Sequence, residues 1–397
     1  MSKLQIAVAC LIMVFALTGF TCTQEENQDF NIVTATEITS HMRVGWNLGN
    51  TLDARGERYG FSWLGGGVYA NTTVEEMETA WVSHVASCEL INAVYKAGFN
   101  TLRIPVSWFK AADENFNIRQ DWMDRVVQVV NYGVANNMYI ILNSHHDEYI
   151  FSLLDDYMEE TKIAFEAIWS QIADTFINYN ERLIFQGMNE PRTRGSPAEW
   201  SGGTAEERAN LNILNQLFVD TIRASGGNNI ERVLMIPTIA ASMDEVAMRA
   251  LVLPTDIVED RIIVTMHSYA PVHFALLPGP HGTRTHWNRN TRSDTQPITS
   301  QIDRAYDLFV SQGIPVVITE MGNINRDNTR ARVDWAEFFV EYASSKGIPS
   351  VWWDNGNHVV TYQNPWGYSE TFGLFDRGTA ELIHPLIVEA LMGADNR

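Results

Sequence analysis

The stretch Leu183-Ile184-Phe185-Gln186-Gly187-Met188-Asn189-Glu190-Pro191 begins as a short apolar run and ends in an amide, a carboxylate and a proline. The apolar residues predict a buried strand, and the strand ends at Pro191 because proline has no N–H to donate to a β-ladder. Glu190 is therefore expected at the carboxyl end of a strand, with Asn189 beside it.

A second stretch repeats this design 130 residues further on. It reads Pro315-Val316-Val317-Ile318-Thr319-Glu320-Met321-Gly322, again an apolar strand that ends in one glutamate. Two glutamates at strand ends suggest the carboxylate pair of a glycosidase, in which one acts as acid/base and the other as nucleophile. Taken singly, each glutamate could equally be a solvated loop residue.

The rest of the chain alternates strand and helix patterns. Capping-box spacings at Thr73–Glu76 and Thr204–Glu207 each open a helix. This alternation predicts a single-domain α/β fold, a (β/α)₈ TIM barrel with its site at the carboxyl ends of the strands. A doubly wound open sheet is the alternative, although no glycine-rich phosphate loop follows any strand. The predicted strands end at Gly45–Asn47, Arg103–Pro105, Leu142–His145, Met188–Glu190, Met235–Thr238, Met266–Tyr269, Ile318–Glu320 and Val351–Asp354.

Polar residues at these strand ends complete the predicted site. Arg103 lies within an apolar strand, where a charge is costly unless it is paired, so we expect it to pair with Glu320 and keep that carboxylate ionised. Strand periodicity places His267 and Tyr269 on one face, where the tyrosine hydroxyl could hold an oxygen of the nucleophile. A structural ion pair and satisfied core residues are the plainer alternatives.

The cluster His145-His146-Asp147-Glu148 could in isolation bind a metal ion. However, adjacent residues of a strand point to opposite faces, so the two histidines are not expected to converge on one ion. We therefore predict neither a metal nor a cofactor, and His145 and His146 become candidates for substrate contacts.

Aromatic residues supply surfaces for a sugar. Of Trp352 and Trp353, one is expected to stack on a sugar ring and the other to pack in the barrel wall. The segment from Pro271 to Pro297 shows no clear secondary structure and would overhang the site, as functional loops do. With aromatic residues in other loops, it predicts an open groove with several sugar subsites, unless these side chains only pack the loops down. The other loop aromatics are Tyr59, Phe61, Trp63, Tyr69 and Trp200.

Charge limits the partners. The chain has 397 residues, with 48 acidic against 28 basic side chains and a net charge of −20. This charge argues against nucleic acid as a partner, whereas a neutral polysaccharide is compatible with it. We expect a monomer.

The N-terminus predicts export. Lys3 followed by an apolar run from Leu4 to Phe20 is typical of an export signal over residues 1–23. Cys22, followed by polar residues, also fits a lipid-modified bacterial N-terminus, which would attach the protein to a membrane. Residues 24–38 are predicted to be a polar link and residues 39–397 the (β/α)₈ catalytic domain. The expected location is extracellular, either secreted or anchored at the cell surface.

The motifs together resemble glycoside hydrolase family 5 of clan A. Asn-Glu-Pro, Leu-Arg-Ile-Pro, His-His, His-Ser-Tyr and Ile-Thr-Glu occur in the order of that family, from about Gly45 to Gly356. Gly-Trp-Asn-Leu-Gly-Asn-Thr-Leu-Asp-Ala and Trp-Trp-Asp-Asn-Gly look most like its endoglucanase and xyloglucanase branch, subfamily 4.

This resemblance implies roles for the site residues. Glu190 would be the acid/base and Glu320 the nucleophile of a retaining endo-β-1,4-glucanase, and Asn189 would bind the sugar 2-hydroxyl. The supporting residues would be Arg103, His145, His267 and Tyr269, and further substrate contacts would come from Asn47, His146, Trp352 and Trp353. Related β-1,4-glycanases (xyloglucan-specific enzymes, mannanases or xylanases) and an inactive carbohydrate-binding protein are the alternatives. Proximity to Glu320 and partial burial are expected to raise the pKa of Glu190.

Overall fold

The computed structural model of the protein describes residues 29–55, 72–148, 150–277, 284–363 and 367–395. The predicted export signal, Cys22 and the loop aromatics Tyr59, Phe61, Trp63 and Tyr69 lie outside these residues. Among the described residues, no helix is long and apolar enough to cross a membrane.

Eight parallel strands close into a barrel in chain order, with β1 paired to both β2 and β8. The closed ring confirms the predicted (β/α)₈ architecture, and all eight predicted strands are present. The strands are β1 (Gly45–Leu48), β2 (Thr101–Ile104), β3 (Tyr139–Asn143), β4 (Leu183–Gln186), β5 (Leu234–Pro237), β6 (Ile262–Ser268), β7 (Val316–Met321) and β8 (Ser350–Asp354).

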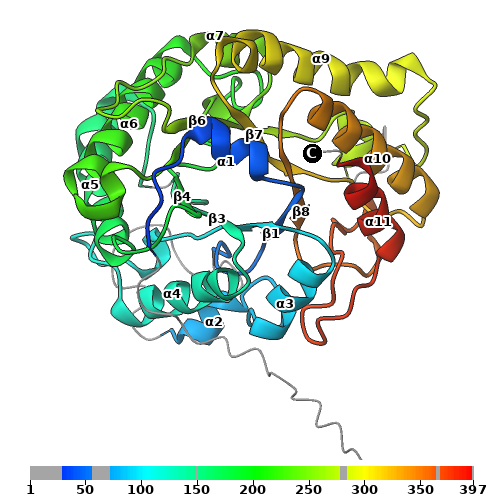
Figure 1. Cartoon of the computed structure of the whole chain (residues 1–397), viewed down its shortest axis with the longest axis horizontal. Coiled ribbons are helices and arrows are strands. Elements are labelled where there is room, and N and C mark those ends of the chain that lie inside the picture. Colours follow the sequence, from blue (N-terminus) through cyan, green and yellow to red (C-terminus); the bar gives the residue numbers. More distant parts are fainter. Residues whose placement is uncertain (1–28, 56–71, 149, 278–283, 364–366, 396–397) are drawn as a thin grey trace, which may run out of the picture.

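Helices surround the barrel, as Figure 1 shows. The predicted capping boxes at Thr73 and Thr204 are both formed, and they open α2 and α6. The outer helices are α2 (Val74–Glu78), α3 (Cys88–Lys96), α4 (Gln120–Ala135), α5 (Met158–Thr175), α6 (Ala205–Ala224), α7 (Glu245–Ala250), α8 (Val272–Ala275), α9 (Arg292–Leu308), α10 (Thr329–Ser345) and α11 (Pro385–Ala394).

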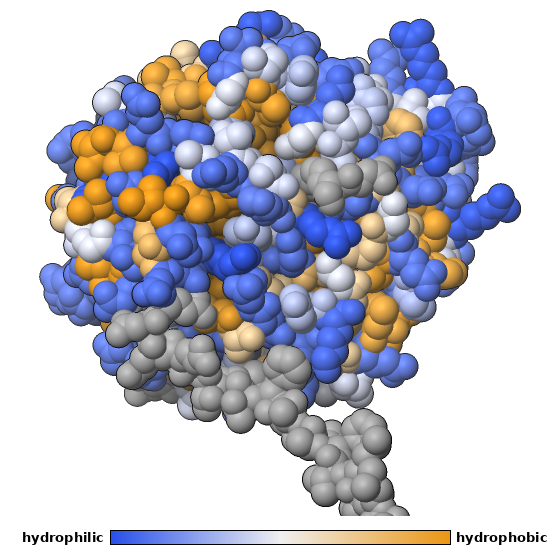
Figure 2. All heavy atoms as spheres, viewed as in Figure 1, coloured by the Kyte–Doolittle hydropathy of each residue, from blue (hydrophilic) through white to orange (hydrophobic). Residues whose placement is uncertain are grey.

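A further helix, α1 (Ala35–His41), lies across the amino-terminal end of the barrel (Figure 1). Its buried residues Ala35 and Ile38, together with Met42, pack against the inward-facing side chains of the strands, among them Ile184 and Val317. In the same view, Figure 2 shows this end of the barrel covered by side chains. The barrel is therefore plugged at one end, and a substrate has to approach from the other, where the strands end.

Two predicted boundaries are wrong. The polar link was expected to extend to residue 38, but α1 begins at Ala35, with Thr34 and Glu37 forming its capping box. The segment from Pro271 to Pro297 was expected to be a long loop, but it contains α8 and the first turns of α9. A two-stranded hairpin, β9 (Tyr362–Gln363) with β10 (Gly367–Tyr368), was not expected at all.

Candidate active site

Arg103 and Glu320 form a buried ion pair at the centre of the open end of the barrel. Arg103 lies on β2 with its side chain fully buried, and its Nη1 is 2.8 Å from Oε1 of Glu320 on β7. The other carboxylate oxygen of Glu320, Oε2, accepts a hydrogen bond of 2.9 Å from the hydroxyl of Tyr269. Each oxygen of Glu320 therefore has a donor, as the sequence predicted.

The Arg103 guanidinium also fixes three amide side chains. It donates to the Oδ1 atoms of Asn47 and Asn189, at 2.8 and 2.6 Å, and to Oε1 of Gln186 at 2.8 Å. Because the Oδ1 of Asn189 is engaged, its amide nitrogen is the group that remains for a substrate hydroxyl.

Asn47 was predicted to contact substrate, and the structure contradicts this. Its side chain is fully buried, and its amide nitrogen donates to the carbonyls of Thr319 and Trp352 at 3.0 and 3.1 Å. Since its oxygen accepts from Arg103, none of its polar atoms remains for a sugar. Asn47 holds Arg103 in place.

Glu190 follows β4 and faces Glu320 across the ring of His267. The Nδ1 atom of His267 lies 2.8 Å from Oε1 of Glu190 and 3.5 Å from Oε2 of Glu320. One carboxylate oxygen of Glu190 and one of Glu320 lie within 4.8 Å of each other. Because carboxylate oxygens only accept, Nδ1 is the nitrogen that carries the hydrogen.

The direction predicted for the pKa of Glu190 is wrong. Burial acts to raise this pKa, but the hydrogen bond from His267 and electrostatic interactions with His267, Arg192 and Arg103 lower it, and the pKa lies below its ordinary value. The pKa of Tyr269 is raised well above its ordinary value by burial and by the charges of Glu320 and Glu190. Tyr269 therefore stays protonated and remains a donor.

His145 and His146 do come close together, contrary to the argument from strand alternation. β3 ends at Asn143, so alternation no longer applies to them, and their rings meet edge to face at 4.5 Å. Ligand atoms of Asp53, His145 and His146 all lie within 4.8 Å of one another.

Hydrogen bonding argues against metal binding by His145. Its Nδ1 lies 3.1 Å from the amide nitrogen of Asn143, and the oxygen of that amide is held by the N–H of Val106. Nδ1 therefore accepts, so the proton sits on Nε2, which faces Asp53 at 3.8 Å. A protonated Nε2 cannot ligate an ion. Burial and neighbouring positive charges lower the pKa of both histidines well below the ordinary value, which keeps them neutral.

Trp353 is the tryptophan of the predicted pair that reaches the site. Its ring stacks on that of His145 at 5.5 Å, with 4° between the planes. A Cβ atom on Gly49 would come within 2.8 Å of the Trp353 ring, so glycine allows the ring to lie there. Trp352 is fully buried and donates to the carbonyl of Phe372. Trp352 is therefore the member of the pair that packs in the barrel wall, as expected for one of the two, and it makes no sugar contact.

These groups open onto a cleft of about 460 Å³. Trp200, from the loop after β4, and Trp353, on β8, come from opposite sides of the ring and both line it. Trp200 is 62% exposed, whereas Trp287, from the predicted overhanging loop, is 4% exposed and packs against Phe338. Trp287 is therefore a packing residue. The other cleft aromatics are Trp81, Tyr269 and Phe372.

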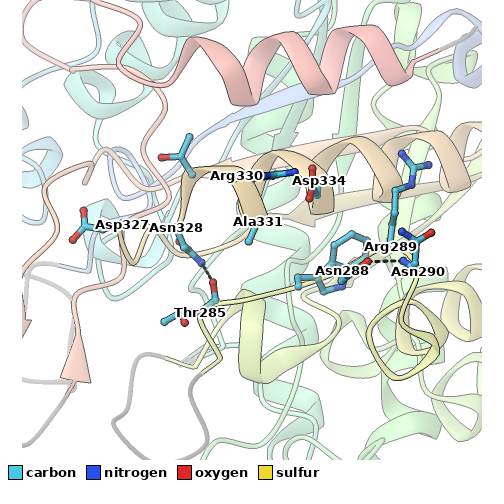
Figure 3. A pocket seen from close by; sticks show the side chains of 11 residues that line it. Thr285, Asn288, Arg289, Asn290, Asp327, Asn328, Arg330, Ala331 and Asp334 are labelled. Atoms are coloured by element: carbon cyan, nitrogen blue, oxygen red, sulfur yellow. Dashed lines mark hydrogen bonds between the residues drawn. The ribbon is translucent and has the colours of Figure 1, made fainter.

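A larger hollow of about 750 Å³ lies elsewhere, between the segment 285–290 and the start of α10 (Figure 3). There Asn328 points to the carbonyl of Thr285 and donates to it at 2.9 Å, and Asn288 accepts from the N–H of Asn290. Its one aromatic side chain, Trp287, is buried, and neither Glu190 nor Glu320 lines it. We therefore assign the chemistry to the smaller cleft.

The sequence argument missed three supporting residues. The carboxylate of Asp53 faces the ring of His145. Gln186 accepts a hydrogen bond from Arg103, and the guanidinium of Arg192 lies beside the carboxylate of Glu190. Gln186 could have been found, because a lone amide directly after the apolar run Leu183–Phe185 of a buried strand needs a buried partner. The contacts of Asp53 and Arg192 depend on tertiary structure.

A closed (β/α)₈ barrel with two facing glutamates at the carboxyl ends of β4 and β7 defines a class, the barrel-type glycoside hydrolases. The chain belongs to glycoside hydrolase family 5, because residues 67–359 match its cellulase (glycosyl hydrolase family 5) description. The resemblance seen in the sequence is thereby confirmed.

Several relatives are similar over most of the chain. Endoglucanase B of Ruminococcus albus is 40% identical over 369 residues, which cover 91% of this chain and 81% of the relative. Endoglucanase A of Clostridium longisporum is 36% identical over 387 residues, 97% of this chain and 70% of the relative.

A solved GH5-4 broad specificity endoglucanase from Ruminococcus champanellensis with bound cellotriose is also similar. It has a TM-score of 0.84 and 38% identity, covering 92% of this chain and all of that one. A mutant lichenase from Caldicellulosiruptor sp. F32 in complex with cellotetraose has a TM-score of 0.83 and 37% identity, over 94% and 98% of the two chains.

Proposed function

We propose that the protein is a retaining endo-β-1,4-glucanase that hydrolyses β-1,4-glucans, mixed-linkage β-glucan and xyloglucan. The observation that carries this proposal is the pair Glu190 and Glu320, whose nearest oxygens lie within 4.8 Å. Retaining glycosidases place their carboxyl groups roughly 5–5.5 Å apart, whereas inverting enzymes leave about 6.5–9.5 Å for a water molecule. The short gap favours retention.

In the first step, an oxygen of Glu320 bonds to the anomeric carbon while the bond from that carbon to the glycosidic oxygen breaks. Glu190 gives its proton to the departing oxygen. Arg103 and Tyr269 hold the oxygens of Glu320 and keep its side chain aimed at the cleft. The product of this step is a glycosyl ester on Glu320.

In the second step, water attacks the anomeric carbon and its proton passes to Glu190, while the bond to Glu320 breaks. The lowered pKa of Glu190 favours the ionised form that this step needs. The same direction means that the protonated form needed by the first step is lost at a lower pH than for an ordinary glutamate.

The glutamate assignment is tested by Glu190→Ala and Glu320→Ala. Each should lower turnover on polysaccharide by several orders of magnitude, because each removes a reacting group. With an activated aryl glycoside, azide should restore part of the activity of the Glu190 variant and give a β-glycosyl azide. Wild-type turnover in either variant would sink the assignment, and an α-azide product would sink retention.

The substrate range is supported by the cleft. Trp200 and Trp353 flank the catalytic pair, and indole faces suit stacking on successive sugar rings. The names of the relatives, endoglucanase and lichenase, point to β-glucans.

A panel of defined polysaccharides is expected to show a rapid fall in viscosity and mixed oligosaccharides early in the reaction, on plain, mixed-linkage and xylose-branched glucans. Release of cellobiose alone at constant viscosity would contradict internal attack. Preferential cleavage of mannan or xylan would favour the related glycanases.

We also propose that the protein is exported and acts as a monomer. The apolar run from Leu4 to Phe20 supports export. Labelling of the expressed protein with a fatty acid, compared between wild type and Cys22→Ser, would separate a lipid anchor from simple secretion.

A further inference from the structure

Arg192, two residues after Glu190, folds back onto it. Its Nη1 donates to the backbone carbonyl of Glu190 at 2.8 Å and lies 3.4 Å from the carboxylate oxygen Oε2. Pro191 between them is anchored, because its carbonyl accepts from the N–H of Ala240 at 2.8 Å. The guanidinium therefore holds both the backbone and the side chain of Glu190.

Two further contacts fix the guanidinium itself. Its Nε pairs with Glu199 at 3.0 Å, and its central carbon lies 4.4 Å from the centre of the Trp200 ring. Glu199 in turn accepts from the N–H of Gly195 at 2.7 Å. With its side chain only 9% exposed, Arg192 is a fixed charge beside the catalytic cleft.

The two oxygens of Glu190 thus face different donors. Oε1 faces Nδ1 of His267, and Oε2 faces Arg192. Arginine has no acceptor, so a proton on Oε2 cannot point at the guanidinium and has to point away from it. This arrangement restricts the direction in which Glu190 can offer its proton.

We propose that Arg192 is a positioning residue for Glu190, which aims the acid proton and favours the ionised carboxylate that the hydrolysis of the glycosyl-enzyme needs. The inference rests on the proposed role of Glu190 as acid/base. It adds a residue that acts on the substrate only through Glu190. An opposite charge at this distance favours the carboxylate over the acid, in agreement with the lowered pKa of Glu190.

The test is the pH dependence of kcat/KM on cellotetraose for wild type, Arg192→Gln and Arg192→Lys. Loss of the charge in Arg192→Gln should move the alkaline limb, where Glu190 loses its proton, to higher pH by about half a unit or more. Arg192→Lys retains the charge and should keep the limb near that of wild type. A merely structural role would lower kcat/KM at every pH and leave the limb where it is.

Glu199→Gln is the matched variant with the opposite expectation. It removes a negative charge near Glu190 and frees Arg192 from its second carboxylate, so the alkaline limb should move to lower pH. This variant keeps the inference testable if Arg192→Gln fails to fold.

An unmoved limb in both Arg192→Gln and Glu199→Gln, or a limb shifted as far in Arg192→Lys as in Arg192→Gln, would overturn the inference. The proposed function fails on a different result, wild-type turnover in Glu190→Ala. If Glu190→Ala is inactive and the limbs do not move, only the role of Arg192 is refuted.

Discussion

Single side chains of this site differ most from what the sequence suggests. The pairing of Arg103 with Glu320 was predictable, because an arginine in an apolar strand requires a buried carboxylate. The direction of the pKa shift of Glu190 was not predictable, because it depends on where the His267 ring and the Arg192 guanidinium lie in space. The role of Asn47 was misjudged for the same reason. Its position in the sequence could not show that its amide oxygen accepts from Arg103 and that its amide nitrogen donates to two backbone carbonyls.

Asp147 offers a test of buried charge at the residue scale. It is 1% exposed, accepts from the N–H groups of Trp108 and Phe109 and from the hydroxyl of Ser144, and burial raises its pKa to about 7. A folded-state pKa above the unfolded value means that the folded state holds a proton that the unfolded state has released. This stabilisation is complete below the unfolded pKa and is lost as pH rises through about 7.

Asp147→Asn should remove that pH dependence. The amide oxygen can accept both N–H groups and its nitrogen can donate to Ser144, so stability at pH about 5 should change little. At pH about 8 the variant should be more stable than wild type, by on the order of 2–4 kcal/mol. The test is to measure the melting temperatures of wild type and variant across this pH range. A variant that is destabilised equally at low and high pH would refute the raised pKa of Asp147.

At the scale of elements, the eight strands were readable because each is an apolar run that ends in polar residues. α1 was missed because its seven residues lie in a polar segment, although the Thr34–Glu37 capping box was a usable signal. The start of α9 was missed because Pro297 lies inside that helix, at its sixth residue, where its missing N–H leaves one intrahelical hydrogen bond unmade. The hairpin of β9 and β10 has strands of two residues, too short for a periodic pattern.

The plug formed by α1 is tested by Ile38→Ala. Ile38 is 2% exposed against the barrel interior, so truncation should cost about 2–5 kcal/mol of unfolding free energy. Turnover well below the melting temperature should stay at the wild-type value, because α1 lies at the end of the barrel away from Glu190 and Glu320.

The matched control is Ile32→Ala. Because Ile32 is 69% exposed, this change should alter the free energy of unfolding by less than about 0.5 kcal/mol. Urea titrations of both variants measure the difference. Equal costs at the two positions would mean that α1 does not plug the barrel.

At the scale of the whole molecule, net charge should distinguish charged from neutral substrates that have the same glucan backbone. With a net charge of −20, the protein should repel carboxymethyl-cellulose, and salt should screen this repulsion. Initial rates on that polymer should therefore rise between about 20 and 200 mM NaCl, over which the screening length shortens severalfold. Neutral hydroxyethyl-cellulose should show no such rise, and an equal salt response on both polymers would contradict the electrostatic explanation.

The pairing of β1 with β8 has a consequence for how the protein behaves in concentrated solution. In an open sheet, the two outermost strands present unpaired N–H and C=O groups, onto which another chain can add a strand. The closed ring of eight leaves no strand of the barrel with a free edge. The barrel therefore offers no template for edge-to-edge assembly, and self-association through its backbone would first require the ring to open along one of its seams.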